Sequence, residues 1–160
     1  MRPERFELAI RIGPLADSSL VARALKPYDL VVCASPDYIR EHGAPQHPED
    51  LAQHDCLGFA HWAPGDRWTL LGPQGEISVS VKSRYRINNG SALRAAAVAG
   101  AGVILQAEVL LRDDIDQGRL VPVLPGYRPP SRPLHVVWPP DRRQTPKIRS
   151  FIDFVAARFG

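Results

Sequence analysis

The sequence predicts an α/β protein, and three observations support this class. Short apolar runs that are typical of strands alternate along the chain with segments that carry helix start and stop signals. Residues 87–105 read in succession as a strand, a turn, a helix, a glycine-rich stop and a strand, which is the order of a βαβ unit. The closing segment, residues 147–158, places its apolar residues at a helical spacing.

The composition is that of a soluble globular protein. The chain has 160 residues, of which 44% are hydrophobic and 23% charged, enough for one domain or two small lobes. The net charge is +3, but the basic residues are dispersed, so charge alone does not indicate nucleic-acid binding. The chain starts with no secretory-signal features, and no apolar run approaches the ~20 residues that span a membrane. We therefore expect a cytoplasmic protein without a membrane partner.

The elements of the first half follow from local signals. Strands are expected at residues 6–12, 19–24, 29–34 and 55–61. The first of them ends at Gly13-Pro14. Ser35 as N-cap and Pro36 at the first helical position predict a helix that runs to about Glu41. A second, short helix is expected over residues 47–52.

In the second half, turn residues separate the expected elements. Gly72-Pro73-Gln74-Gly75 lies between the apolar segments 68–71 and 77–81, which predicts a hairpin. The elements after it are a strand at 84–87, a helix at 108–115, a strand at 120–124, a proline-rich crossover at 125–133, a strand at 133–138 and the helix at 147–158.

The βαβ unit is the segment most indicative of a ligand site. Asn89 or Ser91 can cap the start of its helix, and Gly100 and Gly102 can end it. The apolar run 103–105 is typical of a buried parallel strand. A helix N-terminus with free N–H groups suits a carboxylate or another polar ligand. The alternative is an ordinary packing unit that binds nothing.

The order of the elements predicts two lobes joined by two chain crossings. The middle lobe would cover residues 27–126, and residues 1–26 and 127–160 would share the other lobe, with a hinge and a cleft between them. The expected core of the middle lobe contains Val31, Val32, Leu57, Val98, Val103 and Ile104. Cys33 and Cys56 have no metal or redox spacing, so we expect two buried thiols.

Six blocks of the sequence occur together in one order. They are residues 6–15, 17–23, 32–39, 48–57, 88–104 and 118–124. Each block is weak alone, but the ordered set resembles the C-terminal effector-binding domain of LysR-type transcriptional regulators over nearly the whole chain. One position departs from the family pattern, because Gln106 stands where the family usually has proline.

The resemblance implies a periplasmic-binding-protein type 2 fold, in which two α/β lobes surround a cleft for a small effector. It also implies an intact regulator with an N-terminal winged helix-turn-helix and a linker helix. The chain is similar to the second half of such a regulator, starting partway through the first lobe. The implied function is effector sensing that changes lobe closure and the arrangement of a regulator tetramer on DNA. The alternative is a stand-alone binding protein of the same fold with no role on DNA.

The candidate effector-binding residues stand at expected strand ends, where α/β proteins bind ligands. They are Arg11, Gly13, Phe59, Ala60, His61, Asn88, Asn89, Gly90, Ser91 and Gln106. Arg11 could pair with an acidic effector or form a salt bridge between lobes. Phe59 could be a core residue, residues 88–91 could only cap the helix, and Gln106 could face that turn or lie on the surface. The helix N-terminus and Arg11 suggest a small carboxylate or aromatic acid as effector.

No residue pattern indicates an enzyme, a metal site or a cofactor. The chain lacks a Gly-x-Ser-x-Gly elbow, and its five histidines show no metal-ligand spacing. DNA contact is expected only through an N-terminal domain outside this chain. The strands at 6–12 and 134–138 and the last helix carry apolar faces. Because exposed apolar faces and open sheet edges seek partners, self-association is expected.

Overall fold

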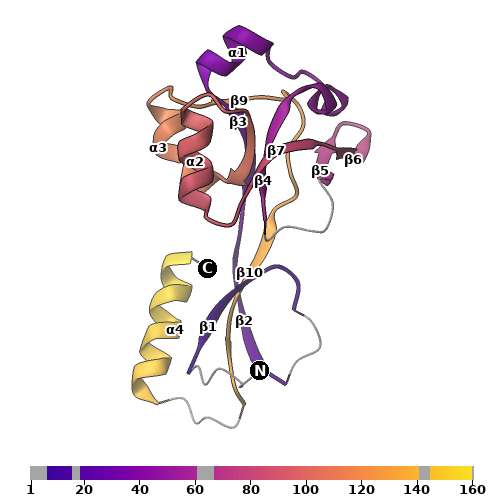
Figure 1. Cartoon of the computed structure of the whole chain (residues 1–160). Helices are drawn as coiled ribbons and strands as arrows, with labels where there is room; N and C mark the ends of the chain where they lie inside the picture. Colours follow the sequence, from indigo (N-terminus) through magenta and orange to yellow (C-terminus); the bar gives the residue numbers. More distant parts are fainter. Residues whose placement is uncertain (1–6, 16–18, 61–66, 141–144, 160) are drawn as a thin grey trace. The chain divides into compact units, whose positions relative to one another are not determined.

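The computed structural model describes residues 7–15, 19–60, 67–140 and 145–159. The chain forms two compact units (Figure 1). Unit 1 contains residues 1–28 and 131–160, and unit 2 contains residues 29–130. None of the helices in the described ranges is long and apolar enough to cross a membrane.

Unit 2 is built on a five-stranded sheet in the order β7-β4-β8-β3-β9. The strands are β3 (Leu30–Ala34), β4 (Asp55–Phe59), β7 (Lys82–Ile87), β8 (Val103–Ala107) and β9 (Val121–Pro122). β4 runs parallel to β7 and β8, whereas β3 runs antiparallel to β8 and β9. The carboxyl ends of β4, β7 and β8 therefore lie at one edge of the sheet.

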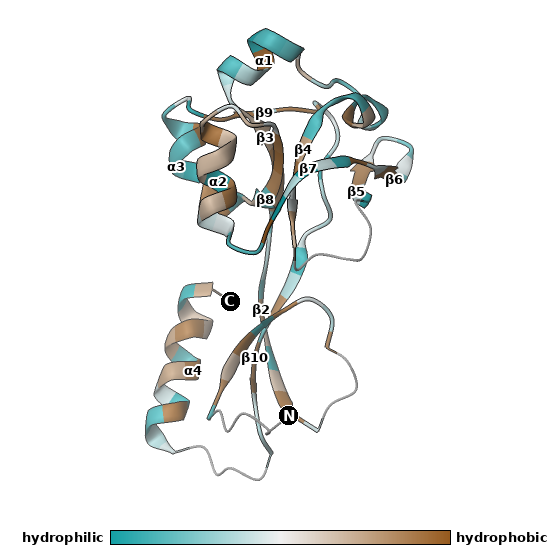
Figure 2. Ribbon diagram, in the orientation of Figure 1, coloured by the Kyte–Doolittle hydropathy of each residue, from teal (hydrophilic) through white to brown (hydrophobic). Residues whose placement is uncertain are grey.

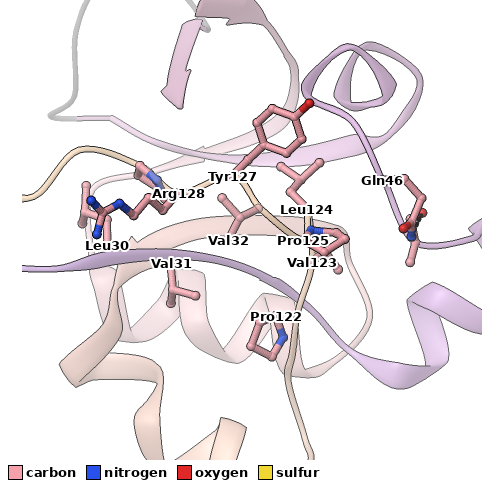
Figure 3. Close-up of a pocket in the computed structure, with 12 residues that line it drawn as sticks. Leu30, Val31, Val32, Gln46, Pro122, Val123, Leu124, Pro125, Tyr127 and Arg128 are labelled. Carbon is pink, nitrogen blue, oxygen red and sulfur yellow. Dashed lines mark hydrogen bonds between the residues drawn. The ribbon is translucent and has the colours of Figure 1, made fainter. Parts of the chain in front are cut away.

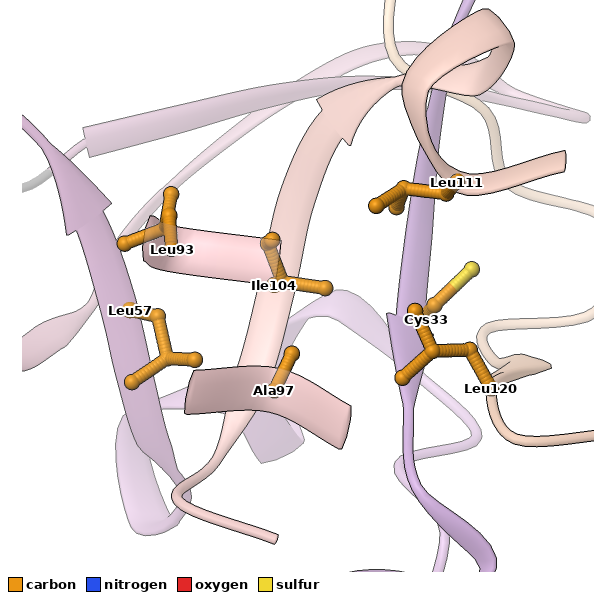
Figure 4. Close-up of a cluster of buried hydrophobic side chains, with 7 residues drawn as sticks. All are labelled: Cys33, Leu57, Leu93, Ala97, Ile104, Leu111 and Leu120. Atoms are coloured by element: carbon orange, nitrogen blue, oxygen red, sulfur yellow. The ribbon is translucent and has the colours of Figure 1, made fainter. Parts of the chain in front are cut away.

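Two helices, α2 (Gly90–Val98) and α3 (Glu108–Asp116), pack beside each other on this sheet (Figure 1). Figure 4 shows the core between helices and strands. Its fully buried members are Cys33, Leu57, Leu93, Ala97, Ile104, Leu111 and Leu120. Leu93 and Ala97 lie four residues apart on α2, so one narrow helix face seals the sheet. Figure 2 shows hydrophobic residues along β3 and β8.

The remaining elements of unit 2 confirm several local predictions. They are α1 (Pro36–His42), the 3₁₀ helix η1 (Pro48–Gln53), β5 (Arg67–Gly72) and β6 (Gly75–Ser80). The Ser35 hydroxyl accepts a hydrogen bond from the Tyr38 amide, as expected of an N-cap. β5 and β6 pair as the predicted hairpin. Cys33 and Cys56 are both buried, and desolvation raises the pKa of Cys33 to about 12.

The described part of unit 1 forms a three-stranded antiparallel sheet and one helix. The sheet has the order β1-β10-β2, with β1 (Ala9–Ile12), β10 (Arg132–Trp138) and β2 (Val21–Tyr28). The helix α4 (Pro146–Phe159) buries Ile148, Ile152 and Val155 against the sheet. The sheet contributes Leu25, Val136 and Trp138 to this core.

Four details differ from the predictions. β2 begins later than expected and extends to Tyr28, because it pairs with β10 over most of that strand's length. β9 has only two residues rather than the expected five, because the chain leaves the sheet after Pro122. Val31 and Val98 are partly buried rather than buried, since they lie at the margin of the core that Leu93 and Ala97 fill.

Candidate functional site

The candidate site in unit 2 lies where three strands end beside the start of a helix. β4 ends at Phe59 and β7 ends at Ile87. The Ala60 amide donates a hydrogen bond to the Ile87 carbonyl at 3.0 Å, which holds the chain ends together beyond the sheet. β8 ends beside them at Ala107. The parallel directions of these strands place all three ends at the same edge.

The turn after β7 fixes the start of α2. Asn89 is the N-cap, and its side-chain oxygen accepts a hydrogen bond from the Ala92 amide at 3.0 Å. The Leu93 amide bonds to the Asn89 carbonyl, so the regular helix ladder begins there. Of the two capping residues that the sequence allowed, Asn89 is the one that caps. In any α-helix the first N–H groups have no intrahelical partner, so Gly90 and Ser91 present donors at this end.

Gln106 is the buried polar side chain at this edge. It is 5% exposed, so it does not lie on the surface. Its side-chain oxygen accepts a hydrogen bond from the Ala107 amide at 2.9 Å. The amide nitrogen is the other polar atom of this side chain. A Cβ built on Gly90 would lie 3.4 Å from this nitrogen, so the Gln106 amide lies against the first residue of α2.

Gly90 leaves room for this close packing, and a larger residue would have to displace its neighbours by a few tenths of an ångström. A Cβ there would also lie 3.0 Å from the Leu110 side chain, tighter than normal contact. Leu110 of α3 is thus a wall of the candidate site that the sequence analysis did not select. The sequence indicated Leu110 only through its position four residues after Gln106, in the helix that follows β8.

The other predicted residues are distributed as follows. Phe59 is partly buried and packs against the unit 2 core, as its alternative interpretation allowed. Ala60 and Asn88 are exposed at the same edge. His61 lies outside the described residues.

Arg11 and Gly13 belong to unit 1. Arg11 is exposed on β1 opposite His135. Gly13 is buried, has a φ of 101° and donates its amide hydrogen to the Pro133 carbonyl at 2.8 Å.

The candidate residues that the structure describes in unit 2 are uncharged, and Glu108, which follows Ala107 at this edge, is paired with Arg112 at 2.8 Å. Arg94, on α2, is engaged elsewhere, because it pairs with the buried carboxylate of Asp114. Among the residues described, no group of three or more histidine, cysteine or acidic side chains could hold a metal. The N–H groups at the start of α2 can therefore bind a polar or anionic small molecule.

Strand ends and a helix N-terminus around a buried amide form an architecture typical of α/β units that bind small ligands. Residues 2–160 match the LysR substrate binding domain, and the chain belongs to this family. Its fold is accordingly periplasmic-binding-protein type 2-like.

Two curated relatives and two solved structures illustrate the similarity. The transcriptional regulator CrgA of Neisseria meningitidis serogroup B is 32% identical over 157 residues, which are 98% of this chain and 52% of CrgA. The transcriptional activator AaeR of Escherichia coli K12 is 30% identical, with 96% of this chain and 50% of AaeR covered. The chain spans about half the length of the curated relatives it matches.

The structure of the CrgA regulatory domain superposes with a TM-score of 0.84 at 34% identity, covering 96% of this chain and 76% of that one. Full-length AphB of Vibrio cholerae, a virulence activator, superposes with a TM-score of 0.85 at 31% identity, covering 100% of this chain and 54% of AphB.

Proposed function

We propose that this chain is the effector-sensing part of a bacterial LysR-type transcriptional regulator. The effector would be a small polar or anionic molecule bound at the start of α2. The candidate contacts in unit 2 are Phe59, Ala60, His61, Asn88, Asn89, Gly90, Ser91 and Gln106. Arg11 and Gly13, which belong to unit 1, are further candidate effector-binding residues.

One observation carries the proposal. The Gln106 side chain is 5% exposed, and its amide nitrogen lies beside the first residue of α2. Its oxygen accepts from the Ala107 amide, so the nitrogen is the end of this side chain that would donate to a ligand. The free amides of the α2 start lie beside it. An acceptor atom of the effector, such as a carboxylate oxygen, would satisfy both sets of donors.

The family supports a regulator rather than the alternative of a stand-alone binding protein. The relatives are named as transcriptional regulators, and this chain corresponds to about half of each. In the intact protein, DNA contact would come from an N-terminal domain, and several copies would assemble on DNA in the cytoplasm. The proposal assigns no catalytic step to this chain.

The test is a titration of the chain with a small carboxylate, benzoate, followed by amide NMR signals. Saturable shifts of Gly90 and Ser91 are expected, because their N–H groups would meet the carboxylate. Gln106→Leu keeps the side-chain size but removes the donor, so it should weaken binding by about tenfold, the value of one hydrogen bond to a charged group.

The matched control is Gln53→Leu, which changes an exposed glutamine at the end of η1. This variant should bind benzoate as the unaltered chain does. Shifts that never saturate, or equal affinity in the Gln106→Leu variant, would contradict this assignment of the site.

A further inference from the structure

A second cavity of unit 2 lies beside β3 and shares no residue with the candidate site at α2. Its volume is about 460 Å³, within the range of small-molecule pockets. Figure 3 shows Leu30, Val31 and Val32 of β3 along one side. The segment from Pro122 to Pro129 forms the other side.

The cavity exists because β9 stops after two residues. The Val123 amide still bonds to the Val32 carbonyl at 3.0 Å, but beyond it the chain leaves the sheet. Leu124 then adopts a φ of 61°, the single positive value among the described residues other than glycine. Its amide bonds to the Pro45 carbonyl at 3.2 Å. The beginning of β3 is therefore left without a strand neighbour on this side, and a hollow remains.

The lining combines an aliphatic middle with a cation at one end. Val32, Val123 and Leu124 lie in the middle, while Arg128 lies beside Leu30 at one end (Figure 3). Val32 and Leu124 are only 2% and 1% exposed, so the open apolar contact comes mainly from Val123, Pro122 and Pro125.

Arg128 is held in place by its backbone, whereas its side chain is available. Its amide and carbonyl both bond to Leu71, at 3.0 and 2.7 Å. The side chain is exposed, and its guanidinium makes no ion pair or hydrogen bond with a residue in the described ranges. A guanidinium without an acidic partner among the described residues, next to an apolar hollow, is complementary to a carboxylate with an apolar body.

We propose that this cavity is a second ligand site that takes a linear aliphatic carboxylate. The carboxylate binds Arg128, and the alkyl chain lies in the hollow lined by Leu30, Val123 and Pro125. The cavity shares no lining residue with the candidate site at α2, although Leu30 and Val31 pair with Ala107 and Gln106 across β3 and β8. Its occupant contacts Leu30 and Arg128, within two residues of where the chain enters and leaves unit 2.

The test uses sodium octanoate as the probe and methyl NMR of the whole 160-residue chain. Saturable shifts are expected for the methyl groups of Leu30, Val32 and Val123 at concentrations up to about 10 mM, the range of weak small-ligand affinity. Arg128→Gln should raise the dissociation constant of octanoate about tenfold, because a charge-assisted pair is lost. The same variant should bind uncharged octan-1-ol as the unaltered chain does.

Two further variants complete the test. Val123→Phe fills the cavity and should abolish the octanoate shifts, with amide spectra showing that the fold persists. Arg112→Gln changes an exposed arginine of α3 outside the cavity and should leave affinity unchanged. The proposal fails if the shifts do not saturate or if Arg128→Gln leaves the octanoate affinity unaltered. It also fails if octanoate shifts only the α2 start, a result that would leave the proposed effector site intact.

Discussion

The two units differ in how completely they cover their own sheets. In unit 2, α2 and α3 seal a core whose seven central side chains are at most 1% exposed. In unit 1, the single helix α4 covers β10 and β2, where an ion pair between Arg23 and Asp153 at 3.0 Å ties it to β2. Ile10 and Ile12 of β1 remain 52% and 58% exposed, although they pair with Val136 and Leu134 of the covered face.

The uncovered part of unit 1 continues onto its helix. Phe151 and Phe154 are 43% and 64% exposed, beside the buried stripe that contains Ile152 and Val155. Lys147, which lies on the same side of α4 as these phenylalanines, is 3.9 Å from Glu7 just before β1. The side of α4 nearer β1 is therefore apolar and open. Unit 2 encloses its own core, whereas unit 1 presents apolar surface suited to a partner.

The largest effect is expected from opening the unit 2 core. Leu57→Ala removes a fully buried side chain and should lower the free energy of unfolding by about 3 kcal/mol. The comparison variant Phe154→Ala changes an exposed side chain of unit 1 and should shift stability by less than about 0.5 kcal/mol. Urea denaturation followed by circular dichroism measures both. If Phe154→Ala lowered the free energy of unfolding more than Leu57→Ala does, unit 2 would not be the better sealed of the two units.

The second effect concerns the charge network that ties α2 to α3. The Asp114 side chain is 1% exposed and accepts hydrogen bonds from Arg94 and Arg119. The Arg94 guanidinium, followed by Arg119, holds the pKa of Asp114 below its usual value despite burial. Asp114→Asn should lower the free energy of unfolding by about 2 kcal/mol, because it removes the charged partner of both arginines. The loss stays moderate because both arginine side chains remain partly solvated.

The pH dependence follows from the direction of that shift. A carboxyl whose pKa is lower in the folded state stabilises the fold above its unfolded pKa, about 4 for aspartate. This contribution should disappear as the pH falls from about 5 through the folded pKa, and the Asp114→Asn variant should lack it. Asp113→Asn, at an exposed neighbouring position, is the control. Equal acid sensitivity in the Asp114→Asn variant and the unaltered chain would refute this account.

Local signals predicted the elements that depend on local physics. Ser35-Pro36 fixes the start of α1 through a cap and a preset φ, and the glycine turn fixes the β5–β6 hairpin, because both act within a few residues. β2 was only partly predicted. Lys26-Pro27-Tyr28 carries no strand pattern of its own, and its extended form comes from pairing with β10. This pairing links residues more than a hundred positions apart, so no local sequence pattern indicates it.

The same distinction holds for the candidate site. The turn at Asn88–Ser91 and the strand end at Phe59 were predicted, because capping residues and strand ends are local features. The burial of Gln106 did not follow from local features, since it depends on β8 lying between β4 and β3 in the sheet. The cavity beside β3 was also missed, because it results from the early end of β9, which the apolar run 120–124 did not indicate.

The open face of unit 1 predicts self-association of the chain. Sedimentation velocity over a range of concentrations should show a monomer–dimer equilibrium. Phe151→Ser combined with Phe154→Ser should weaken it about tenfold, which corresponds to about 1.4 kcal/mol of apolar contact. Val109→Ser is the matched control, because Val109 is 77% exposed on α3 of unit 2. A monomer at every concentration, or an equal effect of Val109→Ser, would show that the face of unit 1 does not pair.

The smallest effect concerns the outer part of unit 2, where α1 and η1 meet. The Tyr38 hydroxyl lies 3.0 Å from Nδ1 of His54, and the Asp55 amide donates to the same hydroxyl. Burial lowers the pKa of His54; the charge of His42 adds to this, while Asp50 and Asp55 oppose it. A histidine with a lowered folded pKa binds fewer protons than the unfolded chain does, so stability should fall as the pH drops below about 6.5.

This loss should be modest, because His54 keeps part of its solvent contact. His54→Gln removes the titrating ring, and its stability should change less between about pH 7 and pH 5.5 than that of the unaltered chain. Urea denaturation at both pH values measures the difference. If both proteins lose the same stability, protonation of His54 is not linked to unfolding, and the α1–η1 region opens independently of the sealed core. If only the unaltered chain loses stability, the cooperative unit that Leu57 anchors extends to its outermost helices.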